Sequence, residues 1–184
     1  RHDGGKLTPL PKKNIDTGSG LERVASVLQG AETNFETDLF MPIIQKLEDI
    51  TGVRYADAKV PFRVMADHVR GSGFLIADGV FPSNEGRGYL LRKLIRRAAT
   101  HGRESGLDSP FLSELIPVVA DILGSVYPDI VEKSGFISTI LTKEEEQFAE
   151  SVQQGRLYVV NNRERLSSES GLADGSIIFT AYDT

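Results

Sequence analysis

The 184-residue sequence contains no cysteine, and this absence excludes disulfide bonds and thiolate metal sites within the chain. Its three histidines, His2, His68 and His101, are scattered and lack the spacing of metal ligands, so we expect no metal site. No apolar run reaches the length of about 18 residues that a transmembrane helix needs, and residues 1–30 show no secretory signal. We therefore expect a soluble, cytoplasmic protein with no membrane partner.

The chain begins with Arg1 rather than Met and ends soon after an apolar run, as an excerpt from a longer protein would. Its length predicts one domain or parts of two, and 40% hydrophobic residues are enough for a sizeable core.

Charge is distributed unevenly along the chain. The net charge is −5, yet residues 84–103 carry six basic residues against Glu85 alone, a local charge of +5. An acidic protein with one concentrated basic segment can still bind a polyanion through that segment.

Apolar periodicity predicts a mainly α fold. Six helices are expected, over residues 21–29, about 37–50, 61–77, 87–101, about 110–125 and about 136–161. Ser19 and Glu22 fit a capping box at the start of the first helix, and Gly30 fits its end. The acidic residues 143–150 are expected to form an exposed face of the last helix, with Phe148 pointing inward.

The segment NIDTGSGLERV, residues 14–24, places two glycines, Gly18 and Gly20, just before an arginine, Arg23. Glycines let the backbone approach a flat ring or a phosphate, and arginine holds phosphate oxygens through several donors. The preceding carboxylate, Asp16, could bind an ammonium group. A helical context excludes a Rossmann fingerprint, and the absence of a following Lys-Ser/Thr excludes a P-loop. From these residues alone, a capped turn and a nucleotide site remain equally open.

The fourth predicted helix has one basic and one apolar side. Its basic side carries Arg92, Lys93, Arg96 and Arg97, and its apolar side carries Leu90, Leu91, Leu94, Ile95 and Ala98. RNA helices are recognised largely through backbone, 2′-hydroxyls and the shallow groove, and a basic helix suits the backbone contacts. The alternative is an ordinary solvated face.

Three stretches carry a resemblance to a known family. IDTGSGLERVASVLQG with NFETDLF resembles motif 3 of class II aminoacyl-tRNA synthetases, in the form found in the alanyl-tRNA synthetase family. VMADHVRGSGFLIADGVFPSNEGRGYLLRKLIRRAATHG is similar to that family's central helical domain, and IIFTAYDT to a later stretch of it. The sequence departs from the family at Ser19, where Met is usual, and at Gly71 and Gly73, where Cys or another small residue is common.

The resemblance implies a two-part organisation. Residues 1–30 would be the end of a class II catalytic domain, with strand only in the first 20 residues as a remnant of its antiparallel sheet. Residues 31–184 would be a helical tRNA-recognition domain. The whole enzyme would activate alanine with ATP and Mg²⁺ and transfer it to tRNA(Ala), with no DNA partner. Motifs 1 and 2 and the zinc-containing editing domain are absent, so the fragment alone is expected to be inactive.

The resemblance also implies residue roles. Asp16 would receive the alanine ammonium, Gly18 would border both alanine and ATP, Gly20 would line the ATP site, and Arg23 would act catalytically on the phosphates.

Two residues match the family's readers of the acceptor-stem G·U pair, Asn84 and Asp183. The alternative for Asn84 is a helix N-cap, and for Asp183 a surface carboxylate. Asp67 and His68 resemble a metal pair, but no second pair completes a site. For the chain as a whole, the alternative is a non-catalytic helical nucleic-acid-binding module that retains a remnant of motif 3.

Overall fold

The computed structural model describes residues 11–12, 14–15 and 17–162, and the chain divides into two units, Arg1–Leu39 and Phe40–Thr184. The described part contains seven α-helices, three short 3-10 helices and no strand, which confirms the mainly α prediction. Of the first 20 residues, where strand was expected, the described ones form none. The predicted boundary between the catalytic and the tRNA-recognition domain, after residue 30, is a boundary of function and stays a prediction.

The first unit contains α1, Leu21–Gln29, and η1, Asn34–Glu36. The helix bounds agree with the prediction, but the capping box is wrong: Gly20 is the N-cap, and no side chain caps the helix. The prediction that the first helix ends at Gly30 is confirmed, because Gly30 adopts a left-handed conformation, φ 63°, at the C-terminal end of α1.

Side-chain hydrogen bonds join α1 to the segment that follows it. Gln29 Nε2 donates to Asp38 Oδ1 at 2.7 Å, and the Asp38 amide donates to Gln29 Oε1 at 3.1 Å. No residue of α1 is buried, and its apolar side chains, Leu28 among them, are exposed. These hydrogen bonds therefore join α1, which has no buried residue, to the segment that follows it.

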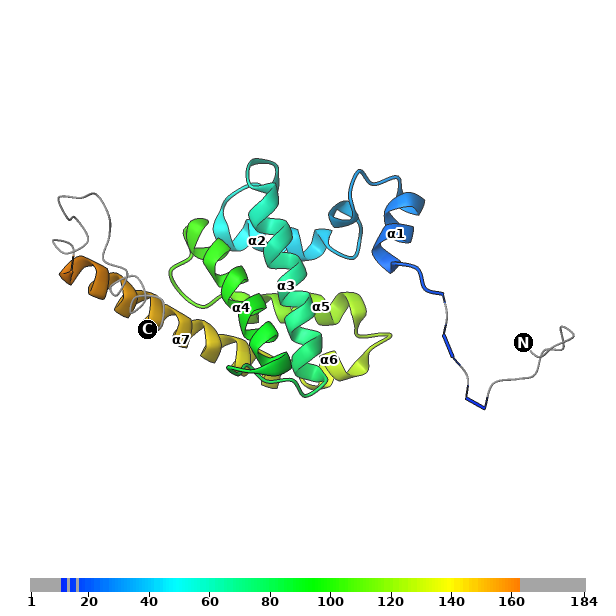
Figure 1. Ribbon diagram of the computed structural model, residues 1–184. Coiled ribbons are helices and arrows are strands. Elements are labelled where there is room, and N and C mark those ends of the chain that lie inside the picture. Colours follow the sequence, from blue (N-terminus) through cyan, green and yellow to red (C-terminus); the bar gives the residue numbers. More distant parts are fainter. Residues whose placement is uncertain (1–10, 13, 16, 163–184) are drawn as a thin grey trace, which may run out of the picture. The chain divides into compact units, whose positions relative to one another are not determined.

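The second unit is a helical bundle (Figure 1). Its elements are α2 Met41–Thr51, η2 Tyr55–Asp57, α3 Lys59–Ala77, α4 Gly86–Glu104, η3 Leu112–Leu115, α5 Ile116–Leu123, α6 Pro128–Glu132 and α7 Ser134–Asn161. The helices α3 and α4 lie side by side and share the most extensive contact, and α7 packs on η3 and α4. The buried residues of α7 all lie in its first half, between Ile137 and Glu145.

Proline accounts for two differences from the predicted bounds. The helix expected from about residue 37 begins at Met41, where Pro42 occupies the first turn. The helix expected over about 110–125 is divided into η3 and α5, and Pro117 occupies the first turn of α5. In both places the ring's fixed φ suits the start of a helix, and the missing N–H removes no hydrogen bond there.

The core of the second unit is mainly aliphatic. Its fully buried large side chains are Ile43, Ile44, Leu47, Phe62, Met65, Ile76, Leu91, Ile95, Leu112, Leu115, Ile116 and Ile130. The predicted apolar side of α4 is correct at Leu91, Ile95 and Ala98 but wrong at Leu90, which is 61% exposed. The buried stripe of α4 is thus centred on Leu91 and Ile95, and Leu90 lies beyond its edge.

Candidate nucleic-acid interface

The loop that precedes α4 is held against the helix at a glycine. A Cβ on Gly88 would lie 2.2 Å from both the Phe81 carbonyl oxygen and Ser83 Oγ, so only glycine allows this close approach. Ser83 Oγ donates to the Glu85 carbonyl at 2.9 Å, and Glu85 is the N-cap of α4. The loop that carries Asn84 is therefore fixed at both ends.

Asn84 does not cap the helix, so the N-cap alternative is wrong: the cap position belongs to Glu85, and no side chain fills it. Instead, the exposed Asn84 side chain accepts a hydrogen bond at Oδ1 from Arg92 Nη1, two turns further along α4. Asn84 and Arg92, both predicted to bind tRNA, are thus in direct contact.

Arg92 and Arg96 share one buried carboxylate. The Nε atoms of Arg92 and Arg96 donate to Glu144 Oε1 of α7 at 3.0 and 2.7 Å. The Glu144 side chain is 4% exposed, whereas the two arginines are partly exposed. Two guanidinium groups compensate the cost of burying this carboxylate.

The prediction that residues 143–150 form an exposed face is therefore wrong at two positions, Glu144 and Glu145, which are buried. No local signal marks Glu144, because its partners lie 48 and 52 residues away in the sequence. Phe148 is partly buried, and the guanidinium carbons of Arg96 and Arg103 lie 5.4 and 5.9 Å from its ring centroid.

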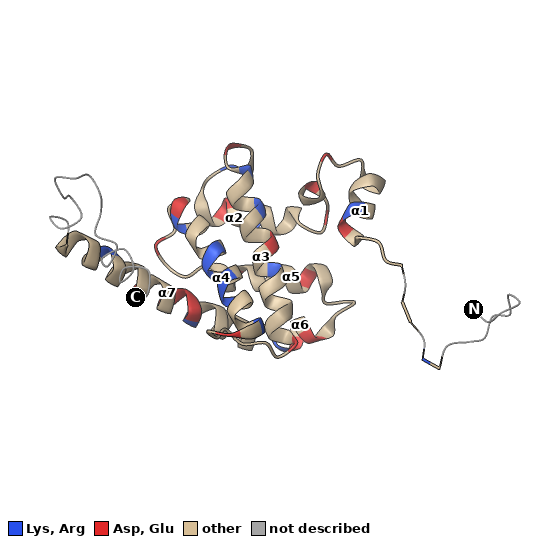
Figure 2. Cartoon of the chain, viewed as in Figure 1, with Lys and Arg blue, Asp and Glu red and all other residues tan. Residues whose placement is uncertain are grey.

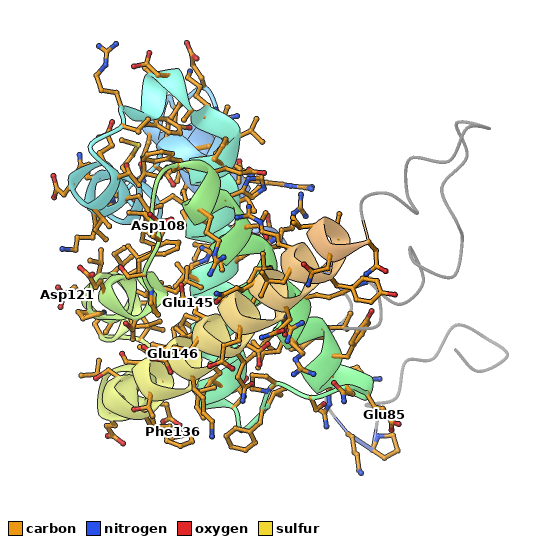
Figure 3. The ribbon with its side chains drawn as sticks, turned by 90° about the vertical axis from the view of Figure 1, so that its left-hand side faces the viewer. Glu85, Asp108, Asp121, Phe136, Glu145 and Glu146 are labelled. Atoms are coloured by element: carbon orange, nitrogen blue, oxygen red, sulfur yellow. The ribbon has the colours of Figure 1, made fainter. Side chains whose placement is uncertain are left out.

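Glu145 has a different environment from its neighbours. Its carboxylate accepts hydrogen bonds from the Phe111 and Leu112 amides at 3.2 and 3.1 Å, at the start of η3. Burial raises the pKa of Glu145 to about 7, although these hydrogen bonds oppose the rise. Figure 3 labels Glu145 beside Glu146, which is exposed on the same helix.

Lys93 and Arg97 are the other two basic residues of the predicted patch, and both are exposed. Lys93 Nζ lies 4.9 Å from the Tyr89 ring centroid. Within the described part of the chain, neither residue forms an ion pair. Figure 2 shows the basic residues concentrated along α4. Of the four predicted cations, two are thus held by a carboxylate and two are available to a polyanion.

An open groove of about 620 Å³ runs beside the two held arginines. Residues of α4 and α7 line it, namely Arg92, Arg96, Gln147, Glu150, Ser151 and Gln154. A second hollow, of about 350 Å³, shares Gln147 and also includes Phe81, Pro82 and Glu144. The surface beside the Asn84 loop is thus hollowed and rich in polar side chains.

The predicted nucleotide site is only partly described. Gly18, Gly20 and Arg23 are exposed at the start of α1, and a Cβ on Gly18 would meet nothing within 4 Å. Asp16 and Asp183 lie outside the described residues. The described residues of the first unit therefore offer an accessible backbone and one arginine.

The Asp67–His68 pair forms a local contact. Asp67 Oδ2 lies 3.1 Å from His68 Nδ1, and this hydrogen bond lowers the pKa of the Asp67 carboxyl. The described residues contain no cluster of three His, Asp or Glu side chains that could bind a metal ion. Nor is any described helix long and apolar enough to cross a membrane.

The second unit is thus a helical bundle in which the basic helix α4 borders a groove lined by polar side chains, and sequence comparison identifies the family of the chain. The profile described as "tRNA synthetases class II (A)" matches residues 1–184, so the chain belongs to this family.

The chain is 50% identical to the alanine–tRNA ligase of Halalkalibacterium halodurans over 184 residues, which is 98% of this chain and 21% of that protein. It is 49% identical to the same enzyme of Geobacillus kaustophilus over 184 residues and 46% identical to that of Thermotoga maritima over 183, with the same coverage. The chain therefore spans about a fifth of the length of these relatives.

Proposed function

We propose that this chain is the part of an alanine–tRNA ligase that supplies motif 3 and recognises the acceptor stem of tRNA(Ala). The similarity to alanine–tRNA ligases over nearly the whole chain carries this proposal. The complete enzyme would activate alanine with ATP and Mg²⁺ and transfer it to tRNA in the cytoplasm. Residues 1–30 would complete the catalytic domain, and residues 31–184 would form the tRNA-recognition domain.

The second unit would bind RNA through α4. Lys93 and Arg97 are exposed and can contact phosphates, through which RNA helices are largely recognised. Asn84 and Asp183 would read the G·U pair of the stem, because short polar side chains can hydrogen-bond base edges in the shallow groove.

The first unit would contribute to adenylate formation. Arg23 would contact the ATP phosphates, Gly18 and Gly20 would let the backbone approach alanine and the adenylate, and Asp16 would bind the alanine ammonium. Because several positioned cations are needed to stabilise the reacting phosphates, this unit would be inactive without the rest of the catalytic domain.

The experiment that tests the recognition role is charging of G·U and G·C acceptor stems by the full-length ligase. Asn84→Ala should lower the G·U preference by roughly 5- to 150-fold, which is the usual effect of one lost base contact, and should leave alanine-dependent pyrophosphate exchange near normal. Asn161→Ala, a change at an exposed asparagine near the end of α7, is the matched control. An unchanged preference in Asn84→Ala would remove Asn84 from the reading site.

The catalytic role is tested separately. Arg23→Ala in the full-length ligase should reduce pyrophosphate exchange by about 100-fold or more, the usual cost of losing one group that stabilises transition-state charge. Exchange at the wild-type rate would place Arg23 outside the site.

A further inference from the structure

Three side chains, two from the start of α4 and its preceding loop and one from α7, form a continuous chain of hydrogen bonds in the second unit. Glu144 of α7 accepts from Arg92 Nε at 3.0 Å, and Arg92 Nη1 donates to Asn84 Oδ1 in the loop before α4. The inner end of this chain, Glu144, is buried, and the outer end, Asn84, is exposed.

The geometry depends on properties that only arginine has. A guanidinium group is planar and carries donors on both Nε and Nη, so it can serve two acceptors at once in a fixed relative direction. A lysine carries the same charge but has a single nitrogen on a flexible stem. At position 92 a lysine could pair with Glu144 or with Asn84, but it would not hold both in the same geometry.

A buried carboxylate is a firm anchor for this arrangement. Glu144 also accepts from Arg96 Nε at 2.7 Å, and the Arg96 guanidinium lies 5.4 Å from the Phe148 ring centroid. Because a buried charge without its partners is costly, the pairing of Glu144 restricts Arg92 to one orientation. Arg92 in turn occupies Asn84 Oδ1, which leaves the two amide N–H donors of Asn84 for a ligand.

We propose that Glu144 and Arg92 are positioning residues, which hold the Asn84 carboxamide in the orientation that reads the acceptor stem. This inference rests on the proposed function, because it presupposes that Asn84 contacts RNA. It gives Arg92 a different task from Lys93 and Arg97: Arg92 orients a reading side chain, whereas the two exposed residues attract phosphates.

The test uses the full-length ligase and the charge-conserving substitution Arg92→Lys. We expect the G·U over G·C ratio of kcat/KM to fall roughly 5-fold or more, in the range of a lost base contact, while the salt dependence of tRNA binding keeps its slope. Pyrophosphate exchange should stay unchanged. Glu144→Gln should lower the same ratio, and Glu146→Gln, which removes a charge from an exposed site on the same helix, should not.

A double substitution separates positioning from packing. If Arg92 acts through Asn84, then adding Arg92→Lys to Asn84→Ala should not lower the ratio any further. An equal loss of charging on both stems in Arg92→Lys would indicate a structural role and would overturn the inference. So would a flatter salt dependence with an intact ratio, because that result would assign Arg92 to a phosphate.

The outcomes also distinguish this inference from the proposed function. If Asn84→Ala leaves the ratio intact, the reading role of Asn84 fails and the positioning role fails with it. If Asn84→Ala lowers the ratio but Arg92→Lys does not, only the positioning role is overturned. If the Glu144→Gln variant does not fold, the Arg92→Lys variant alone tests the positioning role, because the lysine keeps a positive charge beside Glu144.

Discussion

Neighbouring residues of the same chemical kind have opposite environments on the two sides of α4 and α7. Ile95 is fully buried, the buried Glu145 accepts the Phe111 and Leu112 amides, and the partly exposed Arg92 is held by Glu144. Their counterparts of the same chemical kind, Leu90, Glu146 and Lys93, are exposed. Residue type alone therefore does not predict the role of these side chains. Burial and hydrogen-bond partners decide whether a side chain stabilises the fold or is exposed to solvent.

The largest expected difference is between the two aliphatic residues of α4. Ile95→Ala should lower the free energy of unfolding by about 2–5 kcal/mol, because it leaves a cavity in a fully buried position. Leu90→Ala should change it by no more than about 0.5 kcal/mol. Urea unfolding followed by circular dichroism measures both values, and equal losses in the two variants would contradict the assignment of the buried stripe.

The next expected difference is between the two glutamates of α7 and depends on pH. The pKa of Glu145 is raised to about 7 by burial, so the folded state retains a proton that the unfolded state releases above the ordinary value of 4.5. Stability from this group is therefore fully present below about pH 4.5 and is lost as pH rises to about 7, by an amount on the order of 3 kcal/mol.

Glu145→Gln should remove this pH dependence, and Glu146→Gln should leave it in place. The measurement is the free energy of unfolding of both variants and the wild type between pH 4.5 and 8. If the difference between wild type and Glu145→Gln is constant over this range, Glu145 does not titrate as its burial implies.

The smallest expected effect concerns an exposed cation. Lys93→Ala should weaken tRNA binding by the full-length ligase equally for G·U and G·C stems and flatten the salt dependence by up to about one unit of slope. Arg97→Ala should have the same effects on tRNA binding and on its salt dependence as Lys93→Ala. Binding measured across a series of salt concentrations checks this, and a changed stem preference in Lys93→Ala would show that exposed and carboxylate-held residues of α4 do not differ in role.

The sequence predicted the elements that depend on local chemistry. The end of α1 follows from Gly30, which adopts a left-handed conformation. The basic segment is apparent from composition alone, and the resemblance of the motif 3 stretch led to the family that the comparison confirmed. Local analysis was wrong where a residue's role depends on a distant partner, as with the exposed face assigned to residues 143–150.

What the sequence by itself determined is a helical chain of the class II synthetase family with one basic helix. Only the tertiary structure decided which cations of that helix are held by a carboxylate, because Glu144 meets Arg92 and Arg96 through the packing of α7 on α4. An acidic run such as KEEEQ predicts solvent-exposed side chains, because isolated carboxylates are costly to bury. Two guanidinium groups for Glu144 and two backbone amides for Glu145 reduce that cost, and these partners come together only when the helices pack.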